Sequence, residues 1–176
     1  MKIVFLDVDG ELTYSNYENE ETEDIDPEKV KLLKEICDFT HAKVVISSSW
    51  RGTENHTPQR YSILLKILKN NAIEVIDDIP YIEPEYEVST SGCKGVSLVE
   101  PLSYKIKYGT GRAAEVQRWL SLHDVDRFVI LDDEDWDWAS YGYEKYWIQP
   151  TWFGDGGLKP EHVVKAIEIL EGEKYE

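Results

Sequence analysis

The chain has 176 residues, and a hydrophobic fraction of 41% with 12% aromatic residues excludes a disordered protein. Its 35 acidic and 19 basic residues give a formal net charge of −16, which disfavours a long nucleic acid as partner. Two cysteines without metal-ligand spacing, Cys37 and Cys93, indicate neither a disulfide framework nor a zinc site. The apolar start ends too soon for a signal peptide and no stretch approaches the length of a membrane span, so we expect one cytoplasmic domain over residues 1–176.

The first predicted strand ends at Leu6, and acidic residues follow it directly. Its run of apolar residues is typical of a strand that is buried on both faces. Because side chains alternate along an extended chain, Asp7 and Asp9 project to the same side, and Gly10 then allows a sharp turn. Two converging carboxylates indicate a bound cation or a shared proton, and oxygen ligands favour Mg²⁺.

Beside a phosphoryl group, these two acids could divide the work of covalent catalysis. One carboxylate would attack phosphorus in line, and its neighbour would act first as acid and then as base. A turn with both acids in solvent is the alternative for so short a pattern. A calcium loop fits less well, because Leu12 stands where such a loop needs glycine and no helical pattern precedes Asp7.

The run Asp-Val-Asp-Gly-Glu-Leu-Thr, from Asp7 to Thr13, resembles the first motif of the haloacid dehalogenase-like phosphohydrolases. The resemblance implies that Asp7 is the nucleophile and Asp9 the general acid and base. It further implies three later motifs, in order, at the ends of later strands.

An acidic run without periodicity occupies residues 14–26. It predicts a loop, which is either a solvated surface segment or a flap over the active site. A helix is predicted over 27–39, because an Asp-Pro pair precedes apolar residues at helical spacing.

The next predicted strand, 42–47, leads into the run Ser-Ser-Ser-Trp-Arg. A serine at a strand end binds a phosphoryl oxygen without adding charge. This run resembles the second family motif as it occurs in a small subgroup named after Swiss Army Knife RNA repair proteins. The resemblance implies that Ser48, or else Ser47, binds the phosphoryl group. Helix capping is the alternative for the serines, and Arg51 could contact phosphate or pair with nearby acids.

A helix over 58–70 and a strand over 73–76 continue the alternation. Residues 77–111 then loosen into prolines, tyrosines and a turn cluster, and we predict an inserted loop or hairpin there. Larger family members carry a cap domain at this position. The resemblance therefore implies at most a minimal cap and an open site.

Arg112 begins a predicted helix over 112–120. The third family motif needs a cation near such a helix start, normally lysine, to neutralise the phosphoryl group. The resemblance implies that Arg112 takes this role, with Lys107 in reserve, although a guanidinium binds phosphate differently from an ammonium group. A plain surface arginine is the alternative.

A third apolar strand, 127–131, ends in a dense acidic run from Asp132 to Asp137. So many acids repel one another unless they are solvated or bind a metal. The Leu-Asp-Asp sequence resembles the fourth family motif, which implies Asp133 as a metal ligand, with Asp132 and Asp137 as outer or alternative ligands. With the Asp7 carboxylate and the Asp9 backbone carbonyl, these residues would hold Mg²⁺.

Aromatic residues are concentrated between 136 and 152, where they either pack around the last strand, 146–149, or stack a nucleobase. Residues 151–158 resemble the ending of the same subgroup, and a final amphipathic helix follows Pro160.

Together these elements predict a three-layer, Rossmann-like α/β fold with a central parallel sheet and functional groups at the carboxyl ends of its strands. The predicted strands end at Leu6, Ile46, Ile76, Leu131 and Ile148. Our principal hypothesis is a Mg²⁺-dependent phosphomonoesterase that acts on a small phosphorylated substrate through an aspartyl-phosphate. The alternatives are a nucleotide or polynucleotide 3′-phosphatase and a catalytically silent acidic binding protein.

Overall fold

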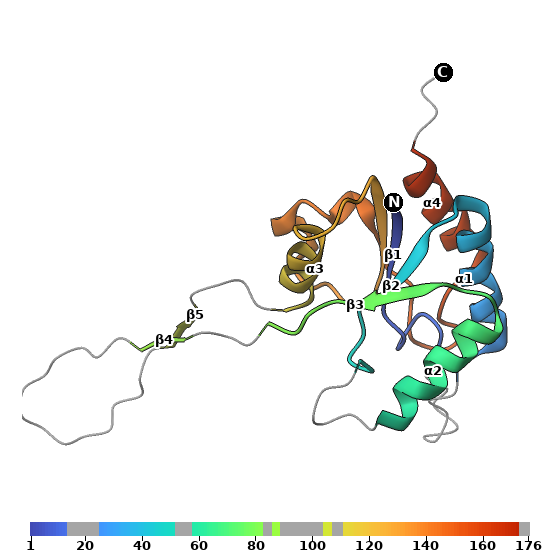
Figure 1. Ribbon diagram of the computed structural model, residues 1–176, viewed down its shortest axis with the longest axis horizontal. Helices are drawn as coiled ribbons and strands as arrows, with labels where there is room; N and C mark the ends of the chain where they lie inside the picture. Colours follow the sequence, from blue (N-terminus) through green and yellow to red (C-terminus); the bar gives the residue numbers. More distant parts are fainter. Residues whose placement is uncertain (14–24, 52–57, 83–85, 89–103, 107–110, 173–176) are drawn as a thin grey trace, which may run out of the picture.

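The computed structural model describes residues 1–13, 25–51, 58–82, 86–88, 104–106 and 111–172 (Figure 1). Its centre is a five-stranded sheet in the order β3-β2-β1-β6-β7, in which every neighbouring pair is parallel. The strands are β1 (Lys2–Leu6), β2 (Lys43–Ile46), β3 (Val75–Asp78), β6 (Arg127–Leu131) and β7 (Trp147–Ile148). The first strand of the chain is therefore the middle strand of the sheet.

Helices cover both faces of this sheet and make three layers (Figure 1). One layer holds α1 (Pro27–Thr40), α2 (Pro58–Asn70) and α4 (Pro160–Glu171). The other holds α3 (Arg112–Leu120) and two short 3₁₀ turns, η1 (Trp138–Tyr141) and η2 (Glu144–Tyr146). The predicted Rossmann-like α/β fold is confirmed.

The side chains of β1 explain why both layers are needed. Val4 and Leu6 pack into the core under α1, α2 and α4, whereas Ile3 and Phe5 pack into the core under α3. All four residues are fully buried. A strand with apolar residues on both faces is stable only where both faces are covered, and the sequence of β1 meets this condition.

The third strand begins and ends two residues later than predicted. Ile73 belongs to the turn after α2, where its amide donates to the Leu68 carbonyl at 3.0 Å. The strand instead includes Asp77 and Asp78 at the edge of the sheet. Both acids accept a hydrogen bond from an aromatic side chain, Asp77 from the Trp119 indole and Asp78 from the Tyr61 hydroxyl. These bonds offset the low strand propensity of aspartate.

The predicted acidic loop and the predicted insertion are described only in part. Of the acidic segment 14–26, only residues 25 and 26 are described, and the Asp26 carboxylate caps α1 by accepting from the Glu28 amide at 2.8 Å. Within 77–111, β4 (Tyr86–Val88) pairs antiparallel with β5 (Tyr104–Ile106). None of the helices in the described ranges is long and apolar enough to cross a membrane.

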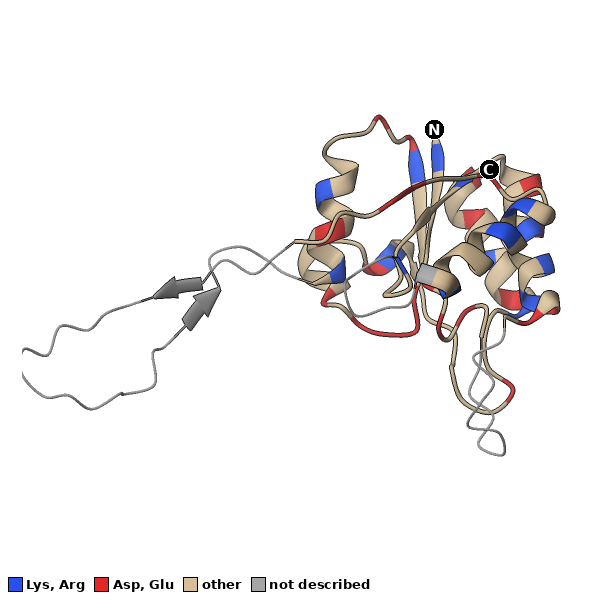
Figure 2. Cartoon of the chain, turned by 60° about the horizontal axis from the view of Figure 1, so that its bottom comes forward, with Lys and Arg blue, Asp and Glu red and all other residues tan. Residues whose placement is uncertain are grey.

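Charged side chains of both signs are interspersed along the helices (Figure 2). On α1, exposed pairs such as Lys34 with Asp38 at 2.7 Å lie in solvent, where an ion pair contributes little stability. Several buried charges, among them Asp7 and Asp132, lie at the carboxyl edge of the sheet.

Candidate active site

Three strands end at the same level of the sheet. Leu6, the last residue of β1, pairs with Ile46 on one side and with Leu131 on the other. The pairing continues one step further, since the Asp7 amide donates to the Leu131 carbonyl at 2.9 Å and the Ser47 amide donates to the Leu6 carbonyl at 2.7 Å. The first, second and fourth predicted motifs therefore meet at one edge.

The chain after Asp7 turns back tightly against the sheet. The Leu12 and Thr13 amides both donate to the Val8 carbonyl, at 2.9 and 3.1 Å. Gly10 has a φ of 83°, and a Cβ at this position would lie 2.5 Å from the Asp133 carboxyl carbon. Glycine is thus required here both by the backbone conformation and by the close approach of Asp133.

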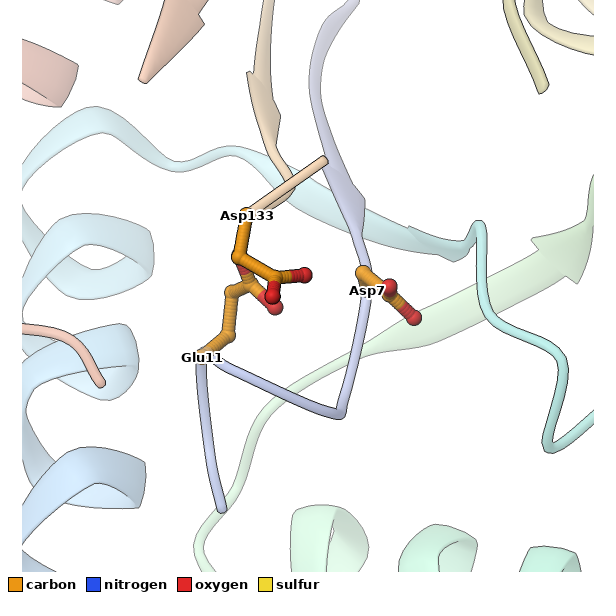
Figure 3. Close-up of side chains that lie close together, drawn as sticks. All are labelled: Asp7, Glu11 and Asp133. Atoms are coloured by element: carbon orange, nitrogen blue, oxygen red, sulfur yellow. The ribbon is translucent and has the colours of Figure 1, made fainter. Parts of the chain in front are cut away.

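Three carboxylates converge at this edge (Figure 3). Asp7, Glu11 and Asp133 each offer one oxygen, and these oxygens all lie within 4.8 Å of one another. Asp7 and Glu11 are buried and Asp133 is half-buried. Neither oxygen of Glu11 has a hydrogen-bond partner among the described residues. We refer to these three residues as the carboxylate cluster.

Glu11 was not among the predicted site residues. The available signal was an ionisable residue four positions after Asp7, between Gly10 and Leu12, in a turn that directly follows a buried strand. Turn residues have no fixed periodicity, so the sequence does not indicate that this side chain lies inside the protein.

Burial and mutual repulsion raise the pKa values of the cluster. Burial raises the pKa of Asp7, while the Arg112 guanidinium and a hydrogen bond from Ser48 lower it. The pKa of Glu11 is held well above its usual value by burial, and then by the nearby charges of Asp7 and Asp132. Burial and the charge of Asp7 raise the pKa of Asp133 to about 6.

A positive charge bound beside the cluster would lower these pKa values and favour the ionised carboxylates. A hard divalent cation fits this set of ligands, because all of them are oxygens and the two on Glu11 are buried without a hydrogen-bond partner in the described part of the chain. The residues present are therefore compatible with Mg²⁺.

Arg112 supplies a positive charge beside Asp7 and Asp132. It is the first residue of α3, and its Nη1 lies 3.5 Å from Asp7 Oδ1 and 3.5 Å from Asp132 Oδ2. The guanidinium also lies over the Trp136 ring, 5.1 Å from its centroid. The predicted cation is thus placed beside the predicted nucleophile, while its reserve, Lys107, lies outside the described residues.

The neighbouring acids have other partners. Asp132 is fully buried and accepts hydrogen bonds from the Glu134 amide at 3.0 Å and the Trp136 indole at 3.1 Å. Burial and the charge of Asp7 raise its pKa to about 8. Asp137 is exposed and accepts from the Ser140 hydroxyl at 2.7 Å. Neither Asp132 nor Asp137 belongs to the carboxylate cluster, so a ligand role for them stays a prediction.

Asp9 differs from Asp7 in its exposure. Its side chain is exposed, and one carboxylate oxygen accepts a hydrogen bond of 2.9 Å from the indole of the buried Trp50. Asp9 is not a member of the carboxylate cluster through its side chain. The indole holds the acid in place while leaving it accessible to a bound molecule.

The two predicted serines are both fully buried. Ser48 hydrogen bonds to the Asp7 carboxylate, and its own oxygen accepts from the Trp50 amide at 3.2 Å. The Ser47 hydroxyl has no partner among the described residues. Of the two roles left open for Arg51, the structure shows pairing, since its guanidinium contacts the Glu115 carboxylate and donates to the Ile79 carbonyl at 2.9 Å.

The structure thus combines a parallel α/β fold, acids after the neighbouring strands β1 and β6, and a cation at the start of α3, which are the features that the resemblance to the haloacid dehalogenase-like class predicted. The chain belongs to the family described as the HAD domain in Swiss Army Knife RNA repair proteins, whose model matches residues 3–163. The match includes every site residue named above, and it supports a hydrolase-type enzyme. No curated protein and no solved structure matches the chain.

The raised pKa of Asp133 predicts a pH-dependent stability in the absence of metal. Because its pKa rises from the ordinary 3.8 to about 6, the folded state binds more protons than the unfolded state between these values. The free energy of unfolding should therefore fall as the pH rises through this window. In EDTA, Asp133→Asn should show a smaller fall between about pH 4 and about pH 7 than the wild type, measured by urea denaturation.

Glu144→Gln provides the control, because it removes an exposed acid of the same charge from η2. This variant should keep the pH dependence of the wild type. A fall in Asp133→Asn as large as that of the wild type would contradict the assignment.

Proposed function

We propose that the protein is a Mg²⁺-dependent phosphomonoesterase that uses Asp7 as its nucleophile. The main support is that Asp7 has two kinds of partner. The carboxylates of Glu11 and Asp133 lie close to it, and the Ser48 hydroxyl and the Arg112 guanidinium interact with its carboxylate. The first pair suits a cation, and the second pair suits the oxygens of a phosphoryl group.

In the first step, a carboxylate oxygen of Asp7 would form a bond to phosphorus as the bond between phosphorus and the leaving oxygen breaks. Asp9 would donate its proton to that leaving oxygen. Its exposed side chain, fixed by the Trp50 indole, is accessible to a substrate.

In the second step, Asp9 would take a proton from water while the water oxygen bonds to phosphorus. The bond between phosphorus and Asp7 then breaks, and the reaction returns the Asp7 carboxylate and inorganic phosphate. Ser48 and Arg112, with Ser47 beside them, would hold the phosphoryl oxygens through both steps. Arg112 also favours the ionised form of Asp7, which the attack requires, because it lowers a pKa that burial raises.

Mg²⁺ held by the carboxylates of Asp7 and Asp133 and the main-chain carbonyl of Asp9 would supply charge neutralisation and align the phosphoryl group. The donor chemistry of the carboxylate cluster supports this part of the proposal.

Asp7→Asn tests the nucleophile. An amide does not form the covalent intermediate, so turnover of an aryl phosphate in Mg²⁺ should fall by about a thousandfold or more. Asp124→Asn, which removes an exposed acid before β6, should turn over substrate at the rate of the wild type. Circular dichroism would verify that both variants are folded.

Unchanged turnover in Asp7→Asn would remove this residue from its role. A wild-type protein that binds Mg²⁺ but hydrolyses no phosphate ester across sugar phosphates, nucleotides and 3′-phosphorylated oligonucleotides would instead be an acidic binding protein.

A nucleotide or polynucleotide 3′-phosphatase is a second candidate, and two observations favour it. One is the RNA repair context in the description of the family. The other is an exposed aromatic pair after β7, where the Trp152 and Phe153 rings lie 4.5 Å apart and are 45% and 47% exposed. The segment that carries them returns to the site, since the Leu158 amide donates to the Glu11 carbonyl at 2.9 Å. Such a pair is suited to stacking a base.

This narrower function predicts a substrate-dependent effect of Trp152→Ala. The KM for a 3′-phosphorylated oligonucleotide should rise by about 5- to 100-fold, the loss expected when one stacked base is released. The KM for an aryl phosphate should stay unchanged. Phe39→Ala, on the exposed side of α1, serves as control. If Trp152→Ala changes the KM equally for the two substrates, or does not change the KM for the oligonucleotide, this loop does not stack a base.

A further inference from the structure

We infer that Glu11 is a direct ligand of the cation at this site, so that three carboxylates, instead of two, hold the metal. The inference rests on the cation site of the proposed function and adds a residue to it. With a third anionic ligand, protein folding and cation binding depend on each other more strongly than with two.

The burial of Glu11 creates a need for a partner to its carboxylate. The residue is fully buried, and neither of its carboxylate oxygens has a hydrogen-bond partner in the described part of the chain. Buried acids in proteins are normally paired, hydrogen-bonded or bound to a metal. The Arg112 guanidinium is shared between two other acids, since it lies 3.5 Å from both Asp7 and Asp132.

The Glu11 side chain extends toward the other two carboxylates of the cluster. Glu11 and Asp133 approach each other from the turn after β1 and the loop after β6, with Asp7 beside them (Figure 3). One oxygen from each residue lies within 4.8 Å of the others, a separation that a single cation can bridge. Asp132 directly precedes Asp133 in the sequence but does not belong to the carboxylate cluster.

The backbone of Glu11 is fixed by both neighbouring segments. Its amide donates to the Val8 carbonyl at 3.4 Å, and its carbonyl accepts from the Leu158 amide at 2.9 Å. Gly157 packs directly against the same carbonyl, because a Cβ there would lie 3.0 Å from its oxygen. The backbone of Glu11 therefore cannot move away from the cluster unless the turn after β1 moves as well.

The test compares Mg²⁺ binding and stability in the whole chain. Glu11→Gln keeps the size of the side chain but removes its charge. Without metal, this variant should melt at or above the temperature of the wild type, because a buried carboxylate without a partner has been removed. Its affinity for Mg²⁺, measured by calorimetry, should fall by about tenfold or more, and the rise in melting temperature on adding Mg²⁺ should shrink accordingly.

Two further variants complete the comparison. Glu134→Gln removes the same charge from an exposed acid beside Asp133 and should keep the affinity of the wild type. Glu11→Asp keeps the charge but shortens its reach, so its affinity should lie between those of Glu11→Gln and the wild type. This second variant preserves the test if Glu11→Gln does not fold.

The results separate this inference from the proposed function. If Glu11→Gln binds Mg²⁺ within about twofold of the wild type while Asp133→Asn loses binding, Glu11 is not a ligand and the proposed function stands. If Glu134→Gln loses as much affinity as Glu11→Gln, the effect is one of general charge and the inference is overturned. If the wild type binds no Mg²⁺, both proposals fail.

Discussion

The parallel pairing of β1 with β2 on one side and β6 on the other is the constraint on which the site depends. Because parallel strands present their carboxyl ends at one edge, residues far apart in the chain follow Leu6, Ile46 and Leu131 at a common level. The same pairing creates an electrostatic problem, since it buries acids from two loops beside each other. The Arg112 guanidinium provides a counter-charge, since it lies 3.5 Å from both Asp7 and Asp132.

Hydrogen bonding divides these acids into two groups. Asp132 and Asp7 are supported by the protein, the former by Arg112 and the Trp136 indole, the latter by Ser48 and the Val8 amide. Glu11 has no such support among the described residues and shares the cluster with Asp133. The Glu11 oxygens, which accept no hydrogen bond from the described residues, are the ones that a cation would satisfy, and one of them lies within 4.8 Å of oxygens of Asp7 and Asp133.

The sequence predicted the strand ends well, because apolar runs that stop abruptly at polar residues mark where a buried strand leaves the core. Asp7, Ser48 and Asp133 all follow such runs, and the fold places them together. Glu11 was missed because its turn has no periodicity, and Trp50 because its contact with Asp9 joins distant segments. The shift of β3 has a similar cause, since Ile73 is as apolar as a strand residue but completes the turn after α2.

The central claim is that one divalent cation binds between Asp7 and Asp133. The most direct measurement is anomalous diffraction from crystals of the protein grown with Mn²⁺ in place of Mg²⁺. We expect one strong anomalous peak at the carboxyl edge of β1 and β6, with an oxygen of Asp7 and an oxygen of Asp133 each about 2.1 Å from it. A bound Mn²⁺ that contacts neither residue, in a protein that hydrolyses phosphate esters, would contradict the account.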